Sequence, residues 1–137
     1  MNDIPFYTAA NLTRDPELRT TADGKSVARL SLAVTPRRRE QNTWVDGTPT
    51  FLDATVWGSQ AENVATSLHK GDRVIVIGRV ETRLYTPTQG PSAGQEVRKL
   101  EVVVDEIGPS LRWAEAQIQR VTAQRPDETP VSEEAQS

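Results

Sequence analysis

The sequence lacks cysteine altogether, holds a single histidine, and has only 5% aromatic residues among its 137 positions. Without cysteine, neither a disulfide framework nor a thiolate metal site can form. No apolar run approaches the roughly 20 residues that a membrane-spanning helix needs. The first residues show neither the basic nor the apolar region of a secretory signal peptide. We therefore expect a cytoplasmic protein that makes no contact with a membrane.

Signatures of catalysis are also missing. The histidine, His69, falls at the end of a predicted helix, where the helix dipole favours an exposed cationic side chain. The sequence contains no nucleophile-elbow, zinc-protease or phosphate-loop motif. Its carboxylates are spread over different segments, with no spacing that indicates a metal pair. The sequence thus predicts no enzyme, no metal and no cofactor.

The net charge of −3 argues only weakly against a nucleic-acid partner. Residues 125–137 contain four acidic residues and one basic residue, which accounts for that entire charge. The remaining chain is neutral, and a neutral domain can still carry a basic face. Composition leaves the question of a nucleic-acid partner open.

Alternating hydrophobicity predicts a protein built of strands. In residues 26–34, Ala28, Leu30, Leu32 and Val34 form one face, which is the period of a half-buried strand. Asp-Gly pairs at 23–24 and 46–47 indicate turns. The other predicted strands are 17–21, 48–57, 73–85 with a bend or bulge at Gly78, and 97–107 with Leu100, Val102 and Val104 on one face.

One predicted helix interrupts the strands. Ser59 and Glu62 have the spacing of a capping box, and Gly71 is suited to end the helix. An apolar stripe at helical spacing lies between them, formed by Ala61, Val64, Ala65 and Leu68. Three strands, a helix and two strands match a five-stranded Greek-key barrel of the OB-fold, although other small β domains share the strand count.

The chain divides into three parts. Residues 1–110 form the expected OB-fold domain, and residues 86–95, rich in proline and glycine, form a flexible loop within it. Residues 111–124 are a C-terminal extension. Residues 125–137 have too little apolar surface to fold and are predicted to be a disordered acidic tail.

Several motifs resemble the bacterial single-stranded-DNA-binding protein family. They are residues 11–19 (NLTRDPELR), 27–34 (VARLSLAV), 54–58 (ATVWG) and 70–74 (KGDRV). Residues 102–112 (VVVDEIGPSLR) resemble the actinobacterial branch in particular. The resemblance covers about residues 4–112. It implies an OB-fold homotetramer that wraps and protects single strands in DNA replication, recombination and repair, at the nucleoid.

Three aromatic residues correspond by this resemblance to the family's base-stacking positions: Phe51, Trp57 and Tyr85. A flat ring can stack on any base, so aromatic rings beside cations bind single strands without reading sequence. The alternative interpretation places Phe51 or Trp57 in the barrel interior, and Trp57 could also cover the barrel end.

Cations are predicted to contact the phosphates, although a charge run can simply be a solvated face. Arg38 occupies the position of a stacking tryptophan in the family, and a guanidinium plane can also stack on a base. The predicted phosphate contacts are Arg37, Arg38 and Arg39 in a loop, and Lys70, Arg73, Arg79, Arg83, Arg98 and Lys99. Trp44, in the hairpin that follows, is expected to touch either DNA or a neighbouring subunit.

Two departures from the family pattern favour a secondary paralogue. Asp53 and Glu81 replace residues that tend to be basic, which predicts weaker or more salt-sensitive binding. These acids also leave open the alternative that the chain is an OB-fold module that binds proteins and little DNA.

The second departure is at the tail. In the family, the acidic tail closes with Pro-Phe and recruits replication and repair enzymes, whereas residues 133–137 have the acids without this apolar tip. The sequence therefore does not predict that recruitment.

The extension at 111–124 has two interpretations. Leu111, Ala114, Ile118 and Val121 recur at helical spacing, which predicts a surface helix. In actinobacterial relatives, the segment after the 102–112 motif runs as an extra strand that hooks onto a neighbouring subunit. We favour the hook, with Trp113 buried between chains.

Overall fold

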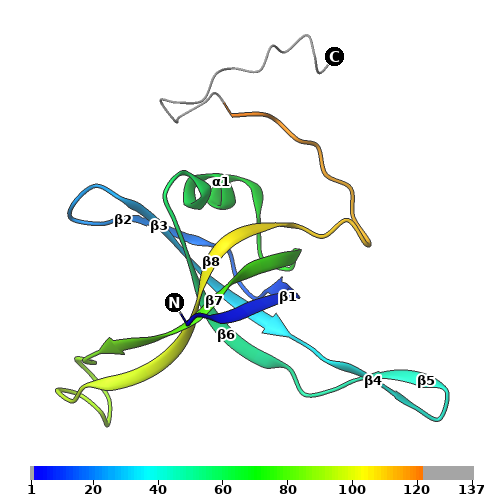
Figure 1. Cartoon of the computed structure of the whole chain (residues 1–137), viewed down its shortest axis with the longest axis horizontal. Coiled ribbons are helices and arrows are strands. Elements are labelled where there is room, and N and C mark those ends of the chain that lie inside the picture. The colour runs from blue at the N-terminus through cyan, green and yellow to red at the C-terminus, as the bar shows by residue number, and fades with distance from the viewer. Residues whose placement is uncertain (1, 122–137) are drawn as a thin grey trace.

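Five long strands close into a barrel in a computed structural model that describes residues 2–121. The pairing order is β1-β7-β8-β6-β3, and β1 also pairs with β3, so the sheet closes on itself (Figure 1). The strands β6 and β8 run parallel where they meet, and the other pairs are antiparallel. The barrel strands are β1 (Ile4–Leu12), β3 (Ser26–Val34), β6 (Thr50–Trp57), β7 (Arg73–Tyr85) and β8 (Val97–Pro109).

The first barrel strand differs from the sequence-based prediction. That strand is β1, whereas β2 (Glu17–Thr20) pairs only with the edge of β3. The β1 segment lacks a clean alternation because small alanines fill its middle, while its large residues Ile4 and Tyr7 remain exposed. Its place in the barrel comes from pairing with β7 along nearly its whole length. The predicted turn at Asp23-Gly24 is confirmed by the β2–β3 hairpin, where Gly24 has a φ of 89°.

The segment between β3 and β6 forms a separate hairpin, so the prediction that Arg37–Arg39 lie in a loop is wrong. The strands β4 (Arg37–Glu40) and β5 (Thr43–Asp46) pair as a two-stranded ribbon that projects from the barrel (Figure 1). The turn falls at Gln41 and Asn42, both with positive φ, and not at Asp46-Gly47. Asn favours this left-handed conformation, which explains where the ribbon reverses.

The core follows the predicted alternation. Ala28, Leu30 and Leu32 of β3 are buried, and the strands that pair around the barrel contribute the other core residues. These include Leu12, Ala54, Val56, Val74, Val76, Val102 and Val104. Leu100 has the same parity as Val102 but is 62% exposed, because β7 and β8 extend past the barrel there as a two-stranded ribbon.

The helix α1 (Ser59–Ser67) covers one end of the barrel with Ala61 and Val64. The predicted capping box does not form, since Gly58 is the N-cap and Glu62 accepts a hydrogen bond from the Ser26 hydroxyl at 2.7 Å. The helix also ends earlier than predicted, at Ser67, with Leu68 as its C-cap. Gly71, with a φ of 91°, instead donates its N–H to the Leu12 carbonyl and joins the following turn to β1.

The predicted irregularity at Gly78 is confirmed as a β-bulge. The β7–β8 register shifts between Ile77 and Gly78, which leaves Asp105 without a partner across the ladder. A Cβ atom on Gly78 would lie 2.2 Å from the Val103 carbonyl oxygen, so only glycine allows this close approach. The bulge bends β7 and β8 where they leave the barrel.

Residues 111–121 form neither a helix nor a strand within the chain, so the helical interpretation is wrong for this part. The large apolar side chains of residues 111–121 are exposed, and Ile118 is 91% exposed. Residues 122–124 and the predicted acidic tail at 125–137 lie outside the described residues. Within residues 2–121, no helix has the length and apolarity to cross a membrane.

Candidate nucleic-acid interface

The aromatic residues of β6 point away from the barrel core. Successive side chains of a strand alternate between faces, so the burial of Ala54 and Val56 places Phe51 and Trp57 on the outer face. Phe51 is 69% exposed and Trp57 is 47% exposed. The interpretation that either residue fills the barrel interior is therefore wrong. Six residues separate them, which corresponds to about 20 Å along the strand.

The strand register joins these residues to a four-stranded outer face. Across β3 and β6, Ala33 lies opposite Phe51 and Arg29 lies opposite Thr55. Across β7 and β8, Arg83 lies opposite Lys99, and Tyr85, which is 39% exposed, lies opposite Val97. The predicted residues that share this face are Phe51, Trp57, Arg79, Arg83, Tyr85 and Lys99.

Two hollows mark the face. One, of about 190 Å³, is lined by Arg29, Asp53, Arg83, Tyr85, Lys99 and Glu101. The other, of about 460 Å³, extends from Arg29 and Glu101 past Thr55 and Arg79 to Arg19 and Trp57. Because the two hollows share residues, they form one shallow path from Tyr85 to Trp57, which we call the outer groove.

The cations of the outer groove are paired with carboxylates. Lys99 donates a hydrogen bond to Asp53, and Arg83 Nη1 lies 3.8 Å from Glu101 Oε2. The Lys99 hydrogen bond lowers the pKa of Asp53 below its ordinary value, burial opposes this, and the charges of Lys99 and Arg29 support it. Asp53 is therefore ionised at neutral pH and partly neutralises its neighbours.

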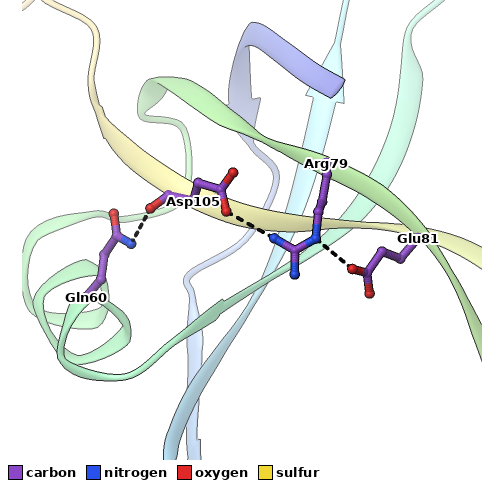
Figure 2. Close-up of polar contacts among 4 residues, drawn as sticks. All are labelled: Gln60, Arg79, Glu81 and Asp105. Atoms are coloured by element: carbon purple, nitrogen blue, oxygen red, sulfur yellow. Dashed lines mark hydrogen bonds and ion pairs between the residues drawn. The ribbon is translucent and has the colours of Figure 1, made fainter. Parts of the chain in front are cut away.

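Arg79 is held by a network that reaches the helix (Figure 2). Its Nε donates to Glu81 at 2.7 Å, and its Nη1 donates to Asp105 at 3.1 Å. The hydrogen bond to Glu81 raises the pKa of Arg79, so the guanidinium remains charged. Gln60 of α1 donates to the Asp105 carbonyl and accepts from the Ile107 N–H, which satisfies the backbone of the bulge.

The three arginines of the β4–β5 hairpin lie apart from the outer groove. Arg37 places its guanidinium 5.6 Å from the centre of the Trp44 ring and 3.8 Å from Asp46. Arg38 lies on the other face of the ribbon and pairs with Glu40 at 3.3 Å. Trp44 is 59% exposed, so the hairpin presents an aromatic ring flanked by cations.

The remaining predicted cations lie outside the outer groove. Lys70 follows α1, and its backbone N–H donates to Asp15. Arg73, at the start of β7, stacks 4.8 Å from the centre of the Trp113 ring. Arg98 alternates with Lys99 and so points to the opposite face of the β7–β8 ribbon. The structure does not bring these three residues together with the aromatic set.

Two cations of the groove were missed by the sequence-based prediction, namely Arg29 and Arg19. The signal for Arg29 was present, because it alternates with the core residues Ala28 and Leu30 and therefore had to face outward. Arg19 had no such signal, since its strand β2 is fully exposed. Among the described residues, no group of three or more acidic or histidine side chains is arranged to hold a metal ion.

A closed five-stranded barrel with a helix between its third and fourth strands defines the OB-fold class. In this class, the face of the second and third strands is the surface that binds oligonucleotides. In the present chain these strands are β3 and β6, which carry Phe51, Trp57 and Arg29.

Comparison with known proteins agrees with this class. Residues 6–110 match the single-strand binding protein family. The chain is 51% identical over 112 residues to the single-stranded DNA-binding protein of Paenarthrobacter aurescens, and 43% identical over 122 residues to that of Mycolicibacterium smegmatis. These alignments cover 80% and 88% of the chain. The chain belongs to the single-strand binding protein family.

A solved structure supports the same fold. The crystal structure of the small single-stranded DNA-binding protein from Streptomyces coelicolor superposes with a TM-score of 0.67 at 32% identity, covering 81% of this chain and 97% of that one. The chain is shorter than some curated relatives. It spans 63% of the Paenarthrobacter aurescens protein and 72% of the Mycolicibacterium smegmatis protein.

Proposed function

We propose that this protein binds and protects single-stranded DNA without reading its sequence, and that it does so without catalysis. The observation that carries the proposal is the exposure of Phe51, Trp57 and Tyr85 on one outer face, where a groove lined with cations runs between Tyr85 and Trp57. The names of the relatives support the same partner.

The binding mechanism follows from the chemistry of the two partners. An unpaired base exposes both ring faces, and stacking on an aromatic side chain contributes about 1–3 kcal/mol per base. A duplex hides these faces, so it cannot use Phe51 or Trp57 in this way. The phosphates of the strand then lie along the cations of the outer groove. Arg79, Arg83 and Lys99 would exchange a carboxylate partner for a phosphate.

We infer that the functional unit is a homotetramer. An apolar patch formed by Tyr7 of β1 and by Ile75 and Ile77 of β7 is at least half exposed in the single chain. Tyr7 lies directly opposite Ile77 in the β1–β7 register, so the patch is continuous. Exposed apolar patches of this kind mark protein–protein contacts.

The C-terminal extension supports a second contact between subunits. Leu111, Trp113 and Ile118 are largely exposed along an extended segment that lacks strand partners within the chain. Pairing with a sheet edge of a neighbouring subunit would bury these side chains. We propose that residues 111–121 form this inter-subunit strand, and the remainder of the predicted extension, 122–124, lies outside the described residues.

The setting follows from the proposed partner. We infer that the protein acts in the cytoplasm, at the nucleoid, where replication, recombination and repair expose single strands. Recruitment of replication and repair enzymes by a Pro-Phe tip is not part of this proposal, because residues 133–137 lack that tip.

A second candidate function is an OB-fold module that binds proteins and little DNA. The observation that favours it is the pairing of groove cations with Asp53, Glu81 and Glu101, which lowers the attraction for phosphate. The exposed aromatic residues on the same face favour DNA instead.

A fluorescence titration distinguishes the two candidates. Tryptophan emission is followed as oligo-dT, a mixed-sequence single strand or a matched duplex is added at low salt. We expect both single strands to quench emission with similar affinity, because stacking is insensitive to sequence. Duplex is expected to bind far more weakly. Equal affinity for duplex would contradict the groove mechanism, and no binding of any strand would favour the protein-binding module.

A further inference from the structure

Three residues line both hollows of the outer groove and therefore mark the point where they meet. These are Arg29 of β3, Arg83 of β7 and Glu101 of β8. Two guanidinium groups and one carboxylate give this junction an excess of one positive charge. Glu101 is mostly buried there, and its Oε2 accepts no hydrogen bond from any described residue, since Arg83 lies too far away at 3.8 Å.

Arg29 differs from every other cation of the outer groove because it has no ion pair with a carboxylate within residues 2–121. Within residues 2–121, its side chain makes no ion pair and no hydrogen bond, although it lies close enough to Asp53 to affect that carboxyl electrostatically. The other groove cations all have a carboxylate partner: Arg19 with Glu17, Arg79 with Glu81 and Asp105, Arg83 with Glu101, and Lys99 with Asp53.

This difference decides at which cation a bound phosphate gains the most binding free energy. A phosphate that approaches Arg79 or Lys99 replaces an existing carboxylate, so one charge-assisted contact is lost as another forms. A phosphate that approaches Arg29 replaces only water. The net gain of a charge-assisted hydrogen bond is therefore greatest at Arg29.

The position of Arg29 also suits a backbone that passes between stacked bases. It lies opposite Thr55, which is two residues from Trp57 and four residues from Phe51 along β6. These separations correspond to about 7 Å and 13 Å along the strand. A phosphate held at Arg29 thus lies between two bases stacked on the two aromatic rings.

We propose that Arg29 is the principal phosphate-binding residue of the outer groove. The proposal rests on the proposed function and assigns the phosphate backbone a path over β3 at the junction of the two hollows. The planar guanidinium can donate two parallel hydrogen bonds to one phosphate, which an ammonium cannot do.

The test compares arginine variants by titration with oligo-dT at several salt concentrations. We expect Arg29→Gln to weaken binding about tenfold at low salt, because one charge-assisted contact is lost. The slope of log K against log salt should fall in magnitude by about 0.7, the value for one phosphate on a single strand. Arg83→Gln, which also frees Glu101, should have a smaller effect.

Controls separate this inference from the proposed function. Arg112→Gln removes one charge outside both hollows and should leave affinity and slope unchanged. Arg29→Lys should keep the slope but lose part of the affinity. Thermal melting checks that each variant is folded. If Arg29→Gln binds like the parent while Phe51→Ala binds weakly, the inference is wrong and the proposed function stands. If neither change affects binding, the proposed function fails as well.

Discussion

Lys99 and Asp53 show how single residues set the strength of the proposed interface. They come from β8 and β6, and their hydrogen bond places a negative charge among the aromatic side chains. The charge of Asp53 has opposite effects on folding and on binding. It stabilises the folded barrel through Lys99, and it competes with the phosphate that the same lysine is predicted to contact.

Replacing Asp53 with Asn tests both effects. Because the folded-state pKa of Asp53 is lowered, its contribution to stability is present above the ordinary value of 3.8 and is lost as pH falls through the folded value. At pH 7 we expect Asp53→Asn to lower the free energy of unfolding by about 0.5 kcal/mol, the scale of a partly exposed ion pair. Denaturant titration should show this difference shrinking below pH 3.8.

The same variant is expected to bind oligo-dT more tightly at low salt, with a steeper salt dependence, because Lys99 becomes available for one further phosphate. Ser31→Ala, a change at the residue opposite Asp53 in the β3–β6 register, is the uncharged control. Unchanged affinity in Asp53→Asn would mean that Lys99 does not contact DNA.

Phe51 carries the aromatic part of the proposal at the residue scale. Phe51→Ala should weaken oligo-dT binding by about 1–3 kcal/mol, the contribution of one stacked base. The melting temperature should stay close to that of the parent, since Phe51 is 69% exposed and packs little. Tyr85→Ala should have a similar but smaller effect, as it borders the loop at 86–95.

Leu100→Ala is the matched control, because this exposed apolar residue points to the other face of the β7–β8 ribbon. Equal loss of binding in Leu100→Ala would show that apolar area in general, and not the outer face, binds the strand.

At the scale of elements, the bulge between β7 and β8 aligns the charged side of the groove. The bulge leaves Asp105 without a partner in the ladder. Gln60 instead forms hydrogen bonds with the Asp105 carbonyl and the Ile107 N–H, and the Asp105 carboxylate accepts a hydrogen bond from Arg79 (Figure 2). The close approach at Gly78 allows this geometry. The position of Arg79 on the outer face therefore depends on the helix and on both strands.

Gly78→Ala should disturb this element. The added methyl group would overlap the Val103 carbonyl, and overpacking of this kind typically costs about 1–3 kcal/mol. Chemical denaturation should show the loss. Gly108→Ala in β8 is the control, since an added Cβ there meets no atom within 4 Å. Equal stability of the two variants would contradict the packing argument.

At the scale of the whole molecule, exposed apolar surface points to assembly. The Tyr7, Ile75 and Ile77 patch and the extension at 111–121 lie on different elements, so they support two contacts of different kinds. A tetramer with both contacts would remove most of this apolar surface from water.

Ile77→Asp should dissociate the assembly into smaller species, because a charge buried in an apolar contact is strongly unfavourable. Sedimentation velocity measures the change, and Leu100→Asp serves as the control.

Deleting the chain from Leu111 onward should instead leave the tetramer in place but lower its melting temperature. If the deletion leaves melting unchanged, the proposed inter-subunit strand is absent.

The sequence by itself determined the barrel interior, whereas the outward direction of Phe51 and Trp57 was decided by the folded structure. Alternation in β3, as in Ala28, Leu30 and Leu32, is a local property with a period of two, so it can be read without knowing the partners of the strand. The bulge at Gly78 was predictable for the same reason, since an isolated glycine in a strand marks a local irregularity. The family resemblance supported the OB-fold over the other small β domains that share the strand count.

Only the tertiary structure decided which segment is the first barrel strand and which cations have partners. The strand β1 has a weak pattern of its own and is defined by its pairing with β7. Lys99 and Asp53 are 46 residues apart in the chain, and their contact depends on how β6 and β8 align. Ion pairs across strands require a register between distant segments, and no local pattern encodes it. For that reason the absence of an ion pair at Arg29 within residues 2–121 became visible only in the folded barrel.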